Sequence, residues 1–124
     1  MAVLELDEQN FEEVILNNDF VVIDFWAPWC GPCQGFAPVY EAASEKHEGI
    51  VFAKVNTEEH QALAGHFQIR SIPTLVIFRE KVIIYAQPGA MPASGFDDLI
   101  AHAKEVDMAQ VHAEIEAESG KENG

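Results

Sequence analysis

Positively charged residues are scarce in this sequence. It contains seven Lys and Arg residues against 21 Asp and Glu, and none of the seven precedes Lys46. Because proteins bind nucleic-acid phosphates mainly through Lys and Arg, a formal net charge of -14 argues against a nucleic-acid-binding role. The acidity favours solubility, and it can also attract basic partners.

Long apolar runs are also missing. No stretch approaches the ~20 apolar residues of a membrane-spanning helix, so we expect no membrane association. The acidic N-terminus, MAVLELDEQN, lacks the basic and apolar segments of a secretory signal peptide, which favours a cytoplasmic location. The 124 residues, 48% of them hydrophobic, are enough for one domain with a core and too few for two.

Cysteine is rare as well, and the only two, Cys30 and Cys33, lie in the stretch WAPWCGPCQ of residues 26–34. In a reducing compartment such a pair is more often catalytic or metal-binding than a structural crosslink. Zinc needs four ligands, and the five His residues show no zinc-knuckle spacing beside this single pair, so no metal is expected. A redox centre and a pair of inert core thiols are the other two alternatives.

The hydrophobic pattern predicts an α/β domain. Apolar runs rich in β-branched residues predict strands at residues 20–26, 50–55, 74–78 and 82–86, with a further short one at 3–6. Apolar residues at helical spacing predict helices at residues 8–17, 32–47, 58–67 and 93–105. Alternating units imply parallel strands joined by helices, and the last two strands form an antiparallel hairpin.

The cysteine pair follows a predicted buried strand and opens a helix. Pro32 suits the first helical turn, where its missing N–H group costs nothing. Cys30 then lies at the helix N-terminus, which favours the thiolate and lowers the thiol pKa. Cys33 lies one turn further and is shielded, so Cys30 is expected to attack a substrate disulfide and Cys33 to resolve the mixed disulfide. This context argues against inert thiols.

The chain resembles thioredoxin over residues 3–106. The resemblance lies in the stretches VVIDFWAPWCGPC, FAPVY, AKVN, QIRSIPTLVIF and PGA. It implies a three-layer α/β/α thioredoxin fold, in which about four helices flank a central mixed sheet of five strands. It also implies a protein-disulfide reductase without a bound cofactor. Electrons would come from an NADPH-dependent thioredoxin reductase and pass to disulfide-containing client proteins, and a monomer is expected.

Gly31 and Pro32, between the cysteines, resemble the dipeptide of reducing thioredoxins, whereas oxidising relatives usually carry a His there. Two rival functions are considered beside the disulfide reductase. One is an oxidase or isomerase of secreted proteins, which the Gly-Pro dipeptide argues against. The other is a binding module whose redox chemistry is incidental, and an intact site argues against it.

Asp24 is the one charge in an apolar strand, six residues before Cys30. Burial raises the pKa of a carboxyl group that has no partner, so Asp24 is expected to be largely neutral. The resemblance implies that it exchanges a proton with Cys33 during the reaction. Lys54, on the neighbouring strand, either tunes Asp24 or extends its ammonium group to solvent.

The resemblance implies three further site segments. Thioredoxins hold the proline that matches Pro73 in a cis peptide bond facing the cysteines, with the backbone of Ile72 free to pair with an extended substrate. Gly89 and Ala90 match a substrate-facing loop. Trp29 is expected to cover the site and contact substrate, and Trp26 to pack beneath it.

Two segments depart from the family pattern. Gln34 stands where many thioredoxins have Lys or Arg, and Gly35 stands where a larger apolar residue is common. Residues 1–107 are predicted to form the thioredoxin domain and residues 108–124 an acidic extension, partly helical or disordered. Met108, Val111 and Ile115 recur at helical spacing, so a frayed acidic end, a packed helix and a partner-docking helix are all considered.

Overall fold

The structure is a computed structural model that describes the backbone of residues 3–123 and the side chains of residues 3–119. Its strands are β1 (Val3–Glu5), β2 (Phe20–Trp26), β3 (Val51–Asn56), β4 (Thr74–Arg79) and β5 (Val82–Pro88). Its helices are α1 (Phe11–Asn17), α2 (Gly31–Lys46), α3 (Gln61–His66), α4 (Ala93–Glu105) and α5 (Met108–Asn123). The predicted alternation of strands and helices is confirmed.

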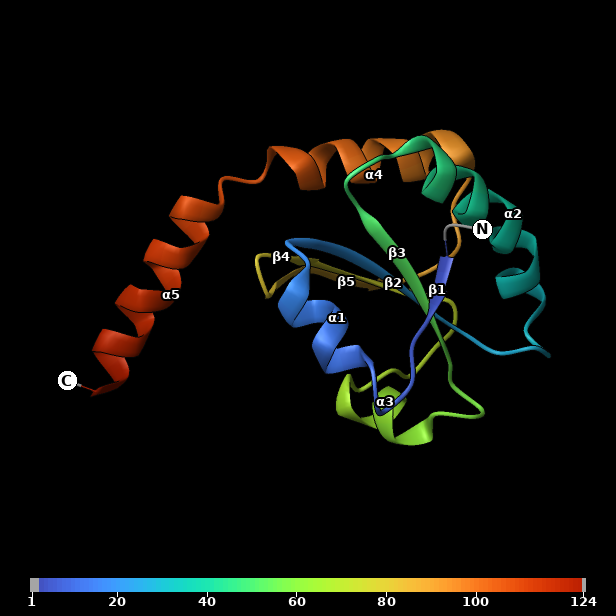
Figure 1. The fold of residues 1–124 in the computed structure, drawn as a ribbon, viewed down its shortest axis with the longest axis horizontal. Helices are drawn as coiled ribbons and strands as arrows, with labels where there is room; N and C mark the ends of the chain where they lie inside the picture. Colours follow the sequence, from blue (N-terminus) through green and yellow to red (C-terminus); the bar gives the residue numbers. More distant parts are fainter. Residues whose placement is uncertain (1–2, 124) are drawn as a thin grey trace.

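The five strands form one mixed sheet in the order β1-β3-β2-β4-β5 (Figure 1). β3 runs parallel to both β1 and β2, whereas β4 runs antiparallel to both β2 and β5. β2 therefore lies in the middle of the sheet, and the chain that leaves its C-terminal end leads directly to the cysteines. This is the mixed α/β sheet that the sequence predicts.

Side chains alternate between the two faces of the sheet and build a core on each. In β2, Val21, Ile23 and Phe25 pack on the face that Ile15 of α1 and Leu63 of α3 cover. Val22 belongs to the other core, where α2 and α4 contribute Phe36, Tyr40, Phe96 and Ile100. Because both faces are covered, β2 reads as an almost unbroken apolar run. Alternation also places Asp24 on the α2 and α4 side.

Tyr40 ties α2 to the sheet. Its hydroxyl oxygen lies 2.9 Å from the carbonyl oxygen of Val22 and 2.6 Å from that of Ala53, so it bridges β2 and β3. Burial, with Asp24 nearby, holds the pKa of Tyr40 well above its usual range. The hydroxyl therefore stays protonated and donates a hydrogen bond. This fixes α2, and with it the helix N-terminus that carries the cysteines.

The turn between β4 and β5 consists of Glu80 and Lys81, with φ of 50° and 70°. Two left-handed residues match the twist of a tight hairpin, but Asn and Gly are the usual choices. Since this backbone costs a non-glycine residue roughly 1–2 kcal/mol, we expect Lys81→Gly to stabilise the chain by up to ~1 kcal/mol in urea unfolding. Gln87→Gly, in the extended backbone of β5, should destabilise it, and a lower midpoint for Lys81→Gly would contradict the prediction.

The C-terminal segment forms a separate helix over Met108–Asn123. Val106 adopts extended backbone and ends α4. The side chain of Asp107 then accepts a hydrogen bond from the backbone N–H of Gln110 at 3.1 Å, as an N-cap residue does. Figure 1 shows α5 projecting away from the body of the sheet. Among residues 3–123, no helix is both long and apolar enough to cross a membrane.

Candidate active site

The cysteine pair occupies the junction between β2 and α2. Cys30 is the N-cap residue of α2, with extended backbone at φ −86° and ψ 111°. The backbone N–H of Cys33 donates to Cys30 Sγ at 3.2 Å, so the sulfur fills the place of a capping oxygen. Gly31 and Pro32 form the start of the helix, where no N–H of Pro32 is required. An N-terminus of this kind stabilises a thiolate on Cys30.

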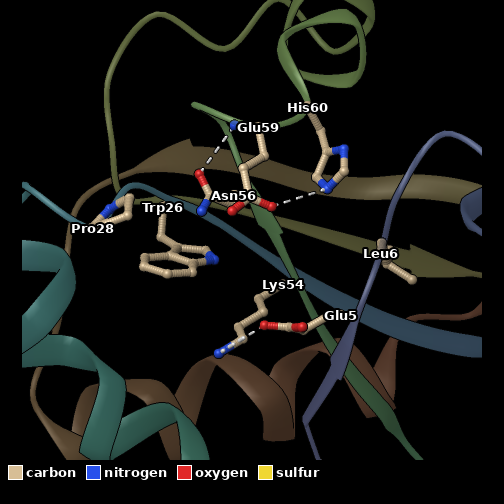
Figure 2. Close-up of a pocket in the computed structure, with 8 residues that line it drawn as sticks. All are labelled: Glu5, Leu6, Trp26, Pro28, Lys54, Asn56, Glu59 and His60. Atoms are coloured by element: carbon tan, nitrogen blue, oxygen red, sulfur yellow. Dashed lines mark hydrogen bonds and ion pairs between the residues drawn. The ribbon is translucent and has the colours of Figure 1, made fainter.

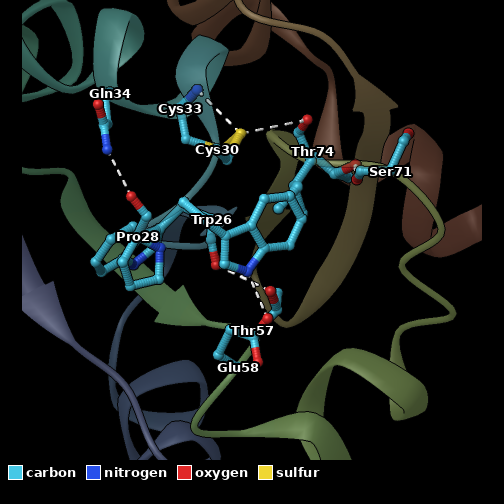
Figure 3. Close-up of a disulfide and its surroundings, with 11 residues drawn as sticks. Trp26, Pro28, Cys30, Cys33, Gln34, Thr57, Glu58, Ser71 and Thr74 are labelled. Atoms are coloured by element: carbon cyan, nitrogen blue, oxygen red, sulfur yellow. Dashed lines mark hydrogen bonds between the residues drawn. A yellow bond between two sulfur atoms is a disulfide. The ribbon is translucent and has the colours of Figure 1, made fainter.

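Cys30 and Cys33 form a disulfide with their Cα atoms 5.2 Å apart. Both are buried, at 4% and 3% exposure, among Ala27, Trp26 and Ile72. Figure 3 shows the cysteine pair together with Trp26. The bond contradicts the reading of two separate core thiols. Within the described part of the chain, no three His, Cys, Asp or Glu side chains gather as a metal site would require.

A segment distant in the sequence forms the opposite wall. Cys30 Sγ lies 3.8 Å from the carbonyl oxygen of Ile72. The Ile72–Pro73 peptide bond is cis, as the resemblance implied. The carbonyl of Pro73 accepts a hydrogen bond from the N–H of Gly89 at 2.8 Å, and Ala90 follows on the exposed side. The fold thus brings Ile72, Pro73 and Gly89 to the cysteine pair.

The two tryptophans lie in different environments. Trp29 is 68% exposed beside the disulfide, and its indole Nε1–H donates to Glu58 Oε1 at 2.5 Å. Trp26 is half-buried against the cysteine pair. Its buried Nε1 has no hydrogen-bond partner among the described side chains and backbone. Trp26 therefore packs beneath the site, and Trp29 stands at its surface.

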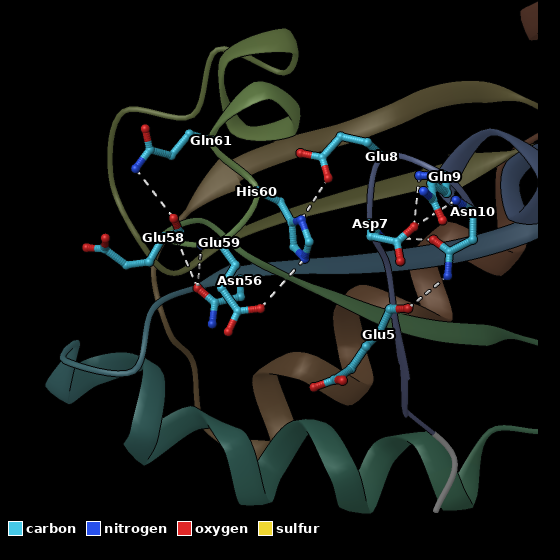
Figure 4. Close-up of polar contacts among 10 residues, drawn as sticks. All are labelled: Glu5, Asp7, Glu8, Gln9, Asn10, Asn56, Glu58, Glu59, His60 and Gln61. Carbon is cyan, nitrogen blue, oxygen red and sulfur yellow. Dashed lines mark hydrogen bonds and ion pairs between the residues drawn. The ribbon is translucent and has the colours of Figure 1, made fainter.

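Glu58 is a site residue that the sequence reading missed. Its backbone N–H, like that of Glu59, donates to Asn56 Oδ1, which folds the chain back after β3 (Figure 4). Thr57 bonds through its N–H and its hydroxyl to the carbonyl of Trp26, at 2.8 and 3.0 Å. These contacts bring Glu58 under Trp29. The acidic segment TEE carries no sequence signal for such a role.

Gln34 has a structural role in place of a charge. Its amide Nε2–H donates to the carbonyl of Pro28 at 2.5 Å (Figure 3). The first turn of α2 is thus tied to the loop that precedes Cys30. A Lys or Arg at this position would add positive charge near the disulfide, whereas Gln34 adds a neutral crosslink between loop and helix.

Asp24 is buried behind the disulfide, at 4% exposure, and its Oδ1 has no hydrogen-bond partner among the described residues. Burial raises the pKa of this carboxyl to about 7, while the charge of Lys54 acts to lower it. Asp24 and Lys54 are paired in register across β2 and β3. At neutral pH the carboxyl is therefore divided between its protonated and ionised forms.

A cavity of about 100 Å³ connects Asp24 and Cys33, and Trp26 and Lys54 also line it. This volume is enough for at least one water molecule. A proton can therefore pass between the Cys33 thiol and the Asp24 carboxyl without direct contact. Asp24 and Cys33 therefore face the same cavity.

Lys54 borders a second, larger cavity of about 310 Å³ on the outer side of Trp26 (Figure 2). Its Nζ lies 5.1 Å from the centre of the Trp26 ring and 3.7 Å from Glu5 Oε1. Across this cavity, His60 Nδ1 lies 2.8 Å from Glu8 Oε1. Lys54 thus lies between Asp24, Trp26 and the surface carboxylate of Glu5.

A helix N-terminus that holds two sulfurs in one reversible bond, above a carboxyl that titrates near neutrality, can exchange disulfides with another molecule. This arrangement defines a thiol–disulfide oxidoreductase. The family model described as Thioredoxin matches residues 2–105. The chain therefore belongs to the thioredoxin family, whose members are protein-disulfide oxidoreductases that use a redox-active disulfide.

Known relatives agree with this assignment. A protein of Streptomyces coelicolor assigned as thioredoxin 2 is 48% identical over 122 residues, which cover 96% of this chain and 91% of the relative. The thioredoxin of Porphyra purpurea is 39% identical over 102 residues, covering 81% and 95%. The solved structure of a mutant thioredoxin from Halobacterium salinarum NRC-1 is 34% identical, with a TM-score of 0.77 and coverage of 85% and 93%. The predicted thioredoxin fold is confirmed.

Proposed function

We propose that this chain works in the reducing direction, with Cys30 as the nucleophile and Cys33 as the resolving thiol. The Cys30 thiolate attacks one sulfur of a client disulfide, forms a mixed disulfide and releases the other client sulfur as a thiolate. Cys33 then attacks Cys30 Sγ, which releases the second client thiol and forms the Cys30–Cys33 disulfide. The N-cap position of Cys30 supports its role as the nucleophile, and the Gly31-Pro32 dipeptide, which resembles that of reducing thioredoxins, supports the reducing direction.

Asp24 is proposed as the group that takes the proton from Cys33 in the second step. A pKa of about 7 suits this role, because an acceptor works best when its pKa lies near the working pH. The cavity shared with Cys33 supplies the route for the proton. Lys54 sets the balance by favouring the ionised carboxyl.

The client is proposed to bind across Trp29, Ile72, Pro73, Gly89 and Ala90. Trp29 offers an exposed aromatic surface beside the disulfide. Ile72 lies next to Cys30 Sγ, so a client strand paired with its backbone would place its own disulfide at the nucleophile. Gly31 and Pro32 support the site by forming the first turn of α2.

Further proposals concern the chain as a whole. Thioredoxins generally interact with thioredoxin reductase and disulfide clients. We propose that this chain receives its electrons from an NADPH-dependent thioredoxin reductase. We also propose that it is a cytoplasmic monomer and binds neither nucleic acid nor metal. Residues 1–107 are the proposed redox domain and residues 108–124 an added extension. The Thioredoxin family match at residues 2–105 supports this division.

The test is the redox equilibrium of the cysteine pair against a graded thiol buffer, followed by the fluorescence of Trp26 and Trp29. We expect a reversible two-electron transition at a reducing potential, roughly the −270 mV typical of thioredoxin. The double variant Cys30→Ser, Cys33→Ser is the control and should show no transition. A potential of roughly −120 to −180 mV, the range of known oxidases and isomerases, would favour the oxidase function. Absence of any transition in the unaltered chain would refute the redox proposal.

A further inference from the structure

A groove separates α5 from the edge of the sheet, at the end of β5 remote from the disulfide. It has a volume of about 530 Å³. Val82 and Ile83 of β5 and Val111 and Ile115 of α5 give it apolar walls, and Glu114 and Glu118 also line it. Figure 1 shows α5 beyond the hairpin of β4 and β5.

The first half of α5 is fixed in place relative to the sheet. Asp107 caps the helix through the N–H of Gln110, and Met108 at its first position is 5% exposed. One turn later, His112 Nε2 lies 3.0 Å from Glu80 Oε1 in the β4–β5 turn. The buried Met108 and the contact between His112 and Glu80 join the first half of α5 to the body of the protein beside the groove.

The sheet wall of the groove is an edge strand. β5 is the last strand in the sheet order and pairs with β4 on one side. Its free side presents backbone N–H and carbonyl groups to which another strand can pair. Ile83 on β5 and Ile115 on α5 are 47% and 45% exposed and line the same groove, so they form an exposed apolar pair. The groove thus offers both backbone pairing and apolar contacts.

The charges of the groove select the occupant. Among residues 3–119, whose side chains the structure describes, those that line the groove include two Glu and no Lys, Arg or His. A second copy of this chain would bring a net charge of -14 and would be repelled. We propose that the groove binds an extended segment of a partner protein in which apolar residues alternate with Lys or Arg. The segment adds a strand to β5, contacts Ile83 and Ile115 with its apolar side chains, and pairs its basic side chains with Glu114 and Glu118.

This position leaves the redox site free. The other end of β5 leads to Gly89, which bonds to Pro73 at the disulfide. β5 has seven residues, so its two ends lie roughly 20 Å apart at ~3.3 Å per residue. A partner in the groove can therefore remain bound while a disulfide is exchanged at the far end of the strand.

The test uses the full chain, labelled with 15N, and an eight-residue acetylated and amidated peptide that alternates Val and Lys. We expect saturable shifts of the β5 and α5 amide resonances, a dissociation constant that rises with salt, and no such shifts with a matched peptide of Val and Glu. The double variant Glu114→Lys, Glu118→Lys should weaken binding by about tenfold or more at low salt. The control double variant Glu45→Lys, Glu48→Lys changes the net charge by the same amount, at one exposed position in α2 and one just after it. Its binding should change less than about twofold.

Three outcomes would overturn the proposal. The first is no saturable shift up to millimolar peptide. The second is equal weakening by both double variants, which would mean that binding follows net charge alone. The third is a concentration-dependent dimer of the unaltered chain in sedimentation that Ile115→Asp abolishes and Leu4→Asp, on the opposite edge strand, does not. That result would make a second copy of the chain the occupant.

Discussion

A chain with Cys33→Ser will accumulate as a covalent one-to-one adduct with a disulfide-containing client. Cys30 remains able to attack, because its place at the N-terminus of α2 and its contact with the Ile72 carbonyl are unaffected. The adduct persists because the serine hydroxyl cannot attack the mixed disulfide. Catalytic turnover should fall to background, while non-reducing mass spectrometry of the reduced variant mixed with insulin should show the adduct.

The matched control is Cys30→Ser, which should lose turnover equally and form little adduct. Cys33 lies one turn inside the helix and lines the interior cavity with Asp24, whereas Cys30 Sγ lies beside the Ile72 carbonyl on the proposed client-binding wall, so we expect a client disulfide to meet Cys30 and not Cys33. The two variants therefore lose the same activity and differ in the product that they trap. If Cys30→Ser forms the adduct and Cys33→Ser does not, the two proposed roles must be exchanged.

The sheet could be predicted from the sequence, because burial determines where apolar residues occur in its strands. β2 is apolar along its length since α1 and α3 cover one face and α2 and α4 the other. The cysteine pair was equally clear, because an N-cap position and a proline in the first turn are local features. The place of Asp24 followed from its being the only charge within that apolar strand.

Other features depend on contacts between segments that the sequence does not connect. The bond from Trp29 to Glu58 requires the chain after β3 to fold back through Asn56 and Thr57. At position 34 the sequence shows only that Gln stands where many thioredoxins have Lys or Arg. The hydrogen bond from Gln34 to the Pro28 carbonyl becomes visible only in the structure. For α5, periodicity indicated a helix, but its direction depends on the break in the helix at Val106 and on one contact between His112 and Glu80.

Replacing Asp24 with Asn will stabilise the chain, and the gain will grow with pH. Burial raises the pKa of this carboxyl from its ordinary 3.8 to about 7 in the folded chain. The folded chain therefore binds more protons than the unfolded chain between these values, and stability falls as pH rises through this window. About three pH units at ~1.4 kcal/mol each give a gain of roughly 4 kcal/mol at pH 8 relative to pH 3.5, as an upper value. Urea unfolding of both proteins across this range measures it.

Asp97→Asn is the matched control for this stability measurement. Hydrogen bonds from Lys46 and His47 lower the pKa of Asp97, so its contribution is present above the unfolded pKa and is lost only as pH falls below it. The gain from Asp24→Asn should therefore grow between pH 4 and 8, whereas Asp97→Asn should be destabilising throughout this range. A gain for Asp24→Asn that is independent of pH would mean that the carboxyl is not held neutral by burial.

Asp24→Asn should also slow the second chemical step, the attack of Cys33 on the mixed disulfide, and leave the first step unchanged. Cys30 attacks without help from Asp24, but Cys33 loses the acceptor for its proton. Because a positioned general base contributes typically 10²–10⁴-fold, we expect the resolving step to slow by about a hundredfold at pH 7. Rapid-mixing fluorescence should show the mixed disulfide persisting, and the deficit should shrink at higher pH as solvent deprotonates Cys33 directly. Identical kinetics of the resolving step in Asp24→Asn and the unaltered chain would remove Asp24 from the mechanism. Its only effect would then be to lower the stability of the folded chain.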